Sequence, residues 1–112
     1  MPLTAVNNFQ IIYGEETSGL ASEISLSRLT SFCYTDTDKR YVHLRDGAIG
    51  TMKIIVHKEI LNSASLIISF DNFALGDFLT SDSAGRAVML LFDGDNWQAL
   101  GEITGTQEWV AS

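Results

Sequence analysis

The chain has 112 residues and a mass of 12.3 kDa, which fits one compact domain spanning residues 1–112. Hydrophobic residues make up 46% and charged residues 19%, a balance that excludes a disordered chain. Fourteen acidic and seven basic residues give a net charge of -7, which argues against direct binding of nucleic acid, and no apolar run has the length of a membrane helix. We therefore expect neither nucleic acid nor a membrane as a partner.

Apolar residues recur at every second position along much of the chain, a period typical of β-strands. Seven to nine short strands with turn residues between them predict an all-β fold, a small β-sandwich or jelly-roll-like domain with two strong hairpins. The expected strands cover residues 9–13, 22–34 with a bulge near Arg28, 39–44, 51–58, 63–70, 73–80, 86–92 and 97–103.

The first ten residues have no evident hairpin partner in the sequence. Pro2 restricts their backbone, and Leu3, Val6 and Phe9 are candidate apolar anchors. Two interpretations stay open for residues 1–10. They form either an attachment arm that binds a partner or an edge strand of the same sheet.

Residues 39–58 are expected to form a basic hairpin around the turn at residues 46–50, whose two glycines accept positive φ. In this register one core face would hold Val42, Leu44, Met52, Ile54 and Val56.

Five of the seven basic residues lie within that hairpin, whereas the rest of the chain is strongly acidic. Such a charge split would allow the hairpin of one subunit to contact an acidic surface of another. Lys39, Arg45 and Lys53 are the candidate contact residues. A solvated basic face is the alternative.

Residues 86–103 predict a second hairpin, with a turn at 93–96, Phe92 opposite Trp97 and Leu90 opposite Ala99. The strand from residue 87 to residue 92 is apolar on both faces, although only one face can reach the core. We therefore expect its second face to contact another chain through Ala87, Met89 and Leu91.

The residues offer little catalytic chemistry. His43 and His57 have basic neighbours rather than a carboxylate, and Cys33 has no metal ligand at a suitable spacing. We expect no enzymatic activity, no catalytic residue, no cofactor and no obligate metal. Asp93 and Asp95 suit a hairpin turn, and the alternative is a cation held by several subunits at a symmetry axis.

Residues 85–101, in which an apolar strand leads into Asp93-Gly94, a polar pair, Trp97 and a short strand ending in Gly101, resemble a segment common in bacteriophage virion proteins. The segment from Tyr41 to Lys58 is similar to the one that precedes it in tail-fibre and head-decoration domains. The resemblance implies a small β-sandwich or jelly-roll module that forms trimers and has no enzymatic role.

Within that class, a chain consisting of one module favours a capsid decoration (cement) protein over a fibre built from repeated modules. We expect a homotrimer on the capsid surface of the virion, where its partner is the major capsid protein. One alternative is a small tail-fibre, baseplate or neck component. Another is a carbohydrate-binding β-sandwich in which Trp97 or Trp109 stacks on a sugar.

Overall fold

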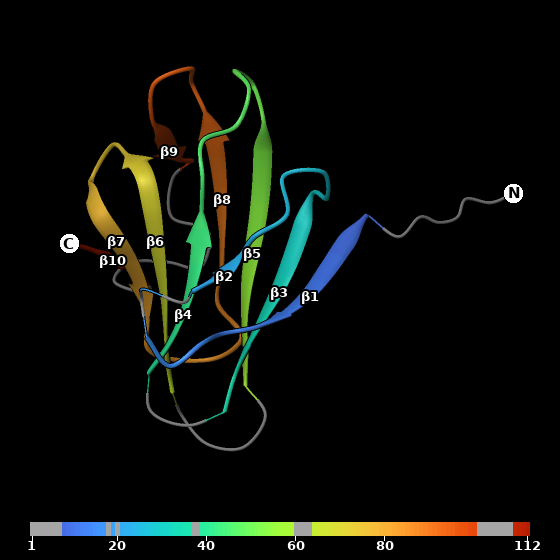
Figure 1. The fold of residues 1–112 in the computed structure, drawn as a ribbon, viewed down its shortest axis with the longest axis vertical. Coiled ribbons are helices and arrows are strands. Elements are labelled where there is room, and N and C mark those ends of the chain that lie inside the picture. The colour runs from blue at the N-terminus through green and yellow to red at the C-terminus, as the bar shows by residue number, and fades with distance from the viewer. Residues whose placement is uncertain (1–7, 18, 20, 37–38, 60–63, 101–108) are drawn as a thin grey trace, which may run out of the picture.

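The all-β prediction is confirmed. The computed structural model describes residues 8–17, 19, 21–36, 39–59, 64–100 and 109–112, and every element named in these ranges is a strand. In chain order (Figure 1) they are β1 Phe9–Tyr13, β2 Ser22–Glu23, β3 Thr30–Thr35, β4 Lys39–Leu44, β5 Met52–Glu59, β6 Ser65–Phe73, β7 Gly76–Ser81, β8 Ala87–Phe92, β9 Trp97–Ala99 and β10 Trp109–Ala111.

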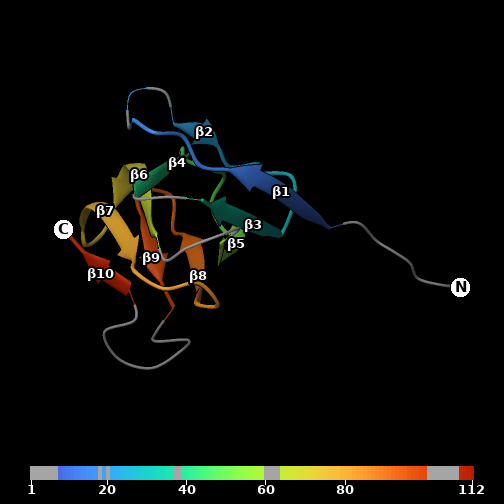
Figure 2. The same cartoon turned by 90° about the horizontal axis from the view of Figure 1, so that it is seen from below.

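The first six strands wind alternately between two halves of one rolled sheet. Strands β1, β3 and β5 pair in parallel in one half, and β2, β4 and β6 pair in parallel in the other. Each successive strand therefore crosses from one half to the other, as in a β-solenoid. Figure 2 shows the strands closing around a common interior.

The last four strands complete this winding with antiparallel pairs. Strand β8 pairs with β5 and extends the first half, which we call the odd half (β1, β3, β5 and β8). Strands β7 and β10 extend the second half, which we call the even half (β2, β4, β6, β7 and β10). Strand β9 joins the halves through β8 and β6. The parallel winding replaces the antiparallel connectivity expected of a jelly roll.

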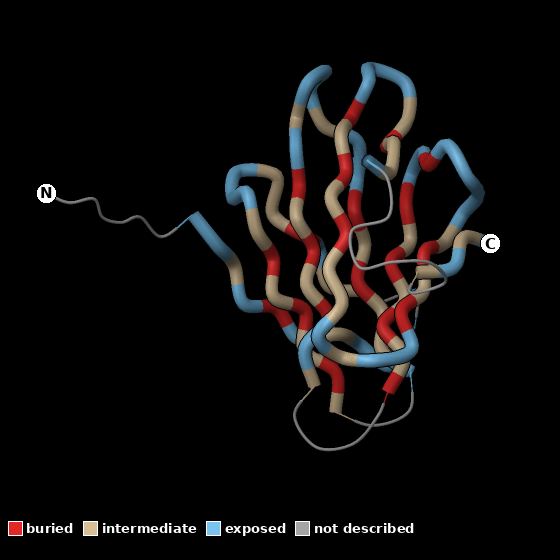
Figure 3. Tube along the Cα trace, turned by 180° about the vertical axis from the view of Figure 1, so that it is seen from behind, coloured by how far each residue is buried: buried red, intermediate tan, exposed pale blue. Residues whose placement is uncertain are grey.

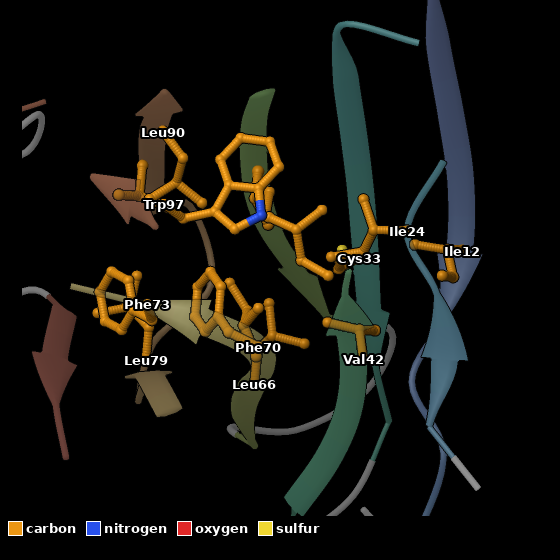
Figure 4. Packing of buried hydrophobic residues seen from close by; sticks show 14 of the residues in the cluster. Ile12, Ile24, Cys33, Val42, Leu66, Phe70, Phe73, Leu79, Leu90 and Trp97 are labelled. Atoms are coloured by element: carbon orange, nitrogen blue, oxygen red, sulfur yellow. The ribbon is translucent and has the colours of Figure 1, made fainter. Parts of the chain in front are cut away.

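The core lies between the two halves (Figures 3 and 4). Inward side chains of the odd half, such as Ile55 and Leu90, pack in one cluster with Leu44 and Leu66 of the even half. Trp97 on β9 is fully buried, and its Nε1 donates a hydrogen bond of 3.0 Å to the carbonyl of Arg45. This bond ties the connecting strand to the end of the even half.

The C-terminal hairpin follows the sequence prediction over its described residues. Strands β8 and β9 are antiparallel, with Phe92 paired to Trp97 and Leu90 paired to Ala99. The rings of Phe92 and Trp97 meet edge to face with centroids 5.3 Å apart. Residues 101–103 of the predicted hairpin lie outside the described residues.

The predicted basic hairpin at residues 39–58 is wrong. Strand β4 pairs with β2 and β6, whereas β5 pairs with β3 and β8, so the two strands lie in opposite halves. The expected shared core face is wrong for β5 as well. Val42 and Leu44 point inward as predicted, but the inward residues of β5 are Lys53, Ile55 and His57.

The single predicted strand at residues 22–34 is also replaced by two short strands. Strand β2 belongs to the even half and β3 to the odd half, and the chain crosses between them at residues 24–29. The change of apolar parity near Arg28 therefore reflects this crossing rather than a bulge.

A buried polar group links the two halves. The His57 ring of β5 lies between the hydroxyl of Thr35 on β3, 3.1 Å from Nε2, and that of Ser81 on β7, 2.7 Å from Nδ1. All three residues are buried. Burial lowers the pKa of His57 from 6.5 to about 4, so the ring is neutral at pH 7.

We predict that this histidine makes the fold sensitive to mild acid. An unfolded His57 takes up a proton below its ordinary pKa of 6.5, whereas the folded ring resists protonation down to about pH 4. The free energy of unfolding therefore falls as the pH drops through this window, by about 2 kcal/mol between pH 7 and pH 5 from this group. Urea unfolding at both pH values measures the loss. His57→Gln should remove this part of the pH dependence, and an unchanged dependence in the variant would contradict the assignment.

Candidate functional site

The outward surface of the odd half is apolar over four adjacent strands, apart from Thr30 on β3 and Lys58 on β5. Pairing aligns its residues in rows across the sheet. One row runs from Ile11 through Phe32 and Val56 to Ala87, and a second row joins Ile54 to Met89. We call this surface the apolar face, and its residues are Phe9, Ile11, Tyr13, Phe32, Tyr34, Met52, Ile54, Val56, Ala87, Met89 and Leu91.

Exposure on the apolar face is greatest along β1. Ile11 is 55% and Tyr13 58% exposed, whereas the apolar residues of this face on the other three strands are half-buried by their neighbours, apart from the exposed Met52 at the start of β5. Aromatic contacts order this edge, since Phe9 packs edge to face on Phe32 with centroids 5.7 Å apart. Strand β1 ends the strand order of the sheet. The face therefore combines exposed aromatic side chains with a sheet edge, both of which favour contact with another chain.

The predicted interface residues of β8 lie on this face. Ala87, Met89 and Leu91 point outward, while Val88, Leu90 and Phe92 are buried in the core. The two-sided apolar pattern of this strand therefore has the geometry expected from the sequence. Which chain contacts the outward side stays a prediction.

The inward surface of the odd half is unusually polar. Ser31, Thr35, Lys53 and His57 are all at most 1% exposed. Lys53 Nζ donates hydrogen bonds to the carbonyl of Arg28 and to the hydroxyl of Ser31, 3.0 Å away. The Ser31 hydroxyl in turn donates to Gln10 Oε1 at 2.8 Å. Lys53 thus has two hydrogen-bond acceptors for an ammonium group that occupies a core position.

The predicted contact between Lys53 and an acidic partner is therefore wrong, because the side chain is buried within its own chain. Burial lowers the pKa of Lys53 to about 8 and raises that of the neighbouring Cys33 thiol to about 12. A thiol with so high a pKa is protonated at pH 7 and is therefore a poor nucleophile.

The other two predicted basic contacts lie near the even half. Lys39 is exposed, and Arg45 Nη1 lies 3.4 Å from Glu23 Oε1, with both side chains 53% exposed. An ion pair of this exposure contributes little to stability. Because β4 and β5 lie in opposite halves, the basic residues of 39–58 do not form one continuous basic ribbon.

The N-terminal candidates are only partly placed. Phe9 lies in β1 and pairs in register with Thr30 of β3, so the edge-strand interpretation holds for Phe9 and Gln10. Leu3 and Val6 lie outside the described residues. The attachment interpretation is thereby limited to the residues before β1.

The structure corrects the expected surroundings of His43. Its Nδ1 lies 2.7 Å from the Ser69 hydroxyl and its Nε2 lies 2.9 Å from Asp71 Oδ1, so a carboxylate does accompany this histidine. Parallel pairing of β4 with β6 places His43 level with Ser69. Sequence reasoning missed this trio because His43 and Ser69 are 26 residues apart in the chain and no local motif indicates that their strands pair.

Serine, histidine and aspartate in this order are the side chains of a hydrolytic triad, but acyl transfer also needs N–H donors aimed at an oxyanion. Ser69 lies within a strand that is paired on both sides, opposite His43 and Phe78. We therefore interpret the trio as an oriented polar row on the outward surface of the even half.

The acidic turn at Asp93 satisfies its own carboxylate. Asp93 Oδ1 accepts the N–H groups of Asp95 and Asn96 at 2.8 Å, and Oδ2 accepts the Gln98 side-chain amide at 2.8 Å. These bonds hold the pKa of Asp93 below its usual range. They match the turn interpretation of this acidic pair. Within the described part of the chain, no group of three or more His, Cys, Asp or Glu side chains is placed to hold a metal ion.

The carbohydrate-binding alternative requires an exposed tryptophan that can stack on a sugar. Trp97 is fully buried and cannot do so. Trp109 is half-buried and packs against the core. Neither indole therefore forms an exposed platform.

Comparisons with protein-family models, with curated proteins and with solved structures found no match to this chain. Among the described residues, no helix has the length and apolar character needed to cross a membrane.

We predict that position 53 responds to charge as a core position. Lys53→Glu should cost more than about 3 kcal/mol of unfolding free energy, because it leaves a buried carboxylate facing the Arg28 carbonyl. Lys53→Met should leave the chain folded. Arg45→Glu is the matched exposed control, with an expected change below about 1 kcal/mol. Urea unfolding followed by circular dichroism measures all three, and equal effects of both Glu variants would contradict the burial of Lys53.

Proposed function

We propose that the protein is a structural, non-enzymatic component of a tailed-bacteriophage virion, a decoration protein that binds the major capsid protein and stabilises the head shell as a homotrimer. The observation that carries this proposal is the apolar face. It supports assembly because it exposes Ile11 and Tyr13 beside half-buried Phe32, Ile54 and Met89. The resemblance of residues 41–101 to modules of virion proteins supports a virion as the assembly to which the chain belongs.

The size of the face suits a subunit contact. Four strands at a spacing of about 4.8 Å and about five residues at 3.3 Å give a plane of roughly 19 Å by 17 Å. This projected area of about 300 Å² reaches the range of the largest apolar patches on typical monomers. A stable interface buries about 800 Å² per partner, so neighbouring parts of the subunit would have to contribute as well.

The proposal also includes the finer description of the fold as a sandwich-like module. Two half-sheets around one core give a compact unit with two broad outward surfaces of different character. A module of this kind can use one surface for contact with other subunits and leave the other in solution. A trimer further presents three identical attachment segments, which gain avidity when three neighbouring shell subunits bind together.

A small tail-fibre, baseplate or neck component is the second candidate, because it would need the same subunit contact. Imaging of purified particles distinguishes the two locations. Labelling over the whole shell supports decoration, and labelling at the tail alone supports the second candidate.

We predict that the apolar face mediates trimer formation. The wild-type chain should have the mass of a trimer at micromolar concentration, and Ile11→Lys combined with Met89→Lys should produce a folded monomer, because each change places a charge on the buried contact. Light scattering coupled to size-exclusion chromatography measures the mass. Leu75→Lys is the matched control, since Leu75 is 63% exposed in the turn between β6 and β7, away from this face. A monomeric wild type, or a variant that remains trimeric, would contradict this assembly.

Shell binding is tested separately by deletion of residues 2–8. If these residues attach the protein, the shortened chain should remain a trimer and no longer bind purified shells in a sedimentation assay. Normal binding would reject the attachment arm. Undecorated shells should also break at a lower temperature than decorated ones. When the ionic strength is lowered stepwise, they should break earlier in the series. Equal resistance of the two kinds of shell would reject the stabilising role.

A further inference from the structure

The outward surface of the even half contains a small groove. It has a volume of about 180 Å³ and is lined by Tyr41 of β4, Ile67 of β6, Phe78 and Thr80 of β7, and Ser112. Strand pairing explains this grouping, since Ile67 is level with Tyr41 on one side and with Thr80 on the other. Two aromatic residues and an aliphatic residue therefore meet a hydroxyl group in one place.

The polar row of His43, Ser69 and Asp71 borders this groove. His43 and Ser69 lie two residues beyond Tyr41 and Ile67 on the same outward surface, and Ser69 is level with Phe78. Because a carboxylate only accepts, His43 Nε2 donates to Asp71 Oδ1, and His43 Nδ1 lies 2.7 Å from the Ser69 hydroxyl. With half of its side chain exposed, Asp71 retains acceptor capacity facing solvent.

A second carboxylate lies on the other side of Tyr41. Glu15 and Tyr41 exchange two backbone hydrogen bonds of 2.8 and 2.9 Å, and the Glu15 carboxylate accepts a bond from the Ser22 hydroxyl. The surroundings of the groove therefore combine fixed carboxylate acceptors with the hydroxyl groups of Tyr41 and Thr80. Lys39 lies on the same surface two residues before Tyr41, so two carboxylates and one ammonium group surround the groove. Their net negative charge disfavours a phosphate, a sulfate or an acidic sugar.

We propose that this groove binds one pyranose ring of a neutral glycan. A pyranose has an apolar face of C–H groups, which suits the Tyr41 and Phe78 rings, and hydroxyl groups at its edge, which suit carboxylate and hydroxyl partners. The volume is below the range of about 300 to 1,000 Å³ found for drug-sized ligands, so one ring fits better than a larger ligand. The groove and the apolar face lie on opposite halves, so this binding is independent of the proposed assembly.

The test is a titration of the ¹⁵N-labelled full chain with methyl glycosides of glucose, mannose, galactose and N-acetylglucosamine, followed by amide chemical shifts and saturation transfer. We expect at least one glycoside to bind with millimolar affinity and to shift Tyr41, Ile67, Phe78 and Thr80. Tyr41→Ala should weaken binding about tenfold, whereas Tyr41→Phe should retain most of it. Asp71→Asn should weaken binding through the loss of a charged acceptor, and its exposure keeps the variant folded.

Two controls separate sugar binding from other causes. Leu75→Lys changes an exposed residue that does not line the groove and should bind as the wild type does. Cyclohexanol, an apolar ring with one hydroxyl group, should bind more weakly than the preferred glycoside. The proposal is overturned if no glycoside produces saturation transfer, if the shifted residues lie elsewhere, or if cyclohexanol binds equally well. None of these results bears on trimer formation, which is measured by mass.

Discussion

Alternation of side chains along a strand governs this structure, because each strand of the odd half has apolar residues on a surface that the fold does not cover. On β5, Met52, Ile54 and Val56 point outward while Lys53 and His57 point inward. A shift of one residue would reverse this arrangement. Parallel pairing with β3 and antiparallel pairing with β8 bring outward apolar residues into register across three strands. The apolar rows thus support one another and become a continuous surface.

The inverted arrangement requires a satisfied polar interior. A buried cation is costly unless hydrogen bonds replace its water, and Lys53 has the Arg28 carbonyl and the Ser31 hydroxyl as acceptors. His57 is held neutral between Thr35 and Ser81, which come from opposite halves. The contact of His57 with Ser81 joins the two halves directly. The polar interior and the apolar exterior are therefore two results of the same register.

The sequence predicts strand pairs whose residues are close in the chain better than pairs whose residues are far apart. The hairpin of β8 and β9 was predictable in class and register because the Asp93 turn is local and its carboxylate bonds the next residues. The parallel winding was not predictable, because each parallel pair joins two strands that have a strand of the other half between them in the chain. The pair of His43 on β4 and Ser69 on β6 is an example. The turn at 46–50 resembles a hairpin turn but carries the chain across the core. Because the sequence predicts β4 as the partner of β5, it also predicts the inward and outward faces of β5 the wrong way round and Lys53 on the surface.

The two outward surfaces differ in a way that matters for any assembly. A module that packs on neighbours through apolar side chains must keep another surface hydrated, or it would aggregate without limit. The even half meets this requirement with Lys39, His43 and Asp71 on its outward side. The net charge of -7 adds a repulsion between modules in every orientation, which burial of the apolar face would have to exceed. In the proposed assembly, this division of apolar and polar character would limit association to the apolar face, and the aromatic groove of the even half would face solution.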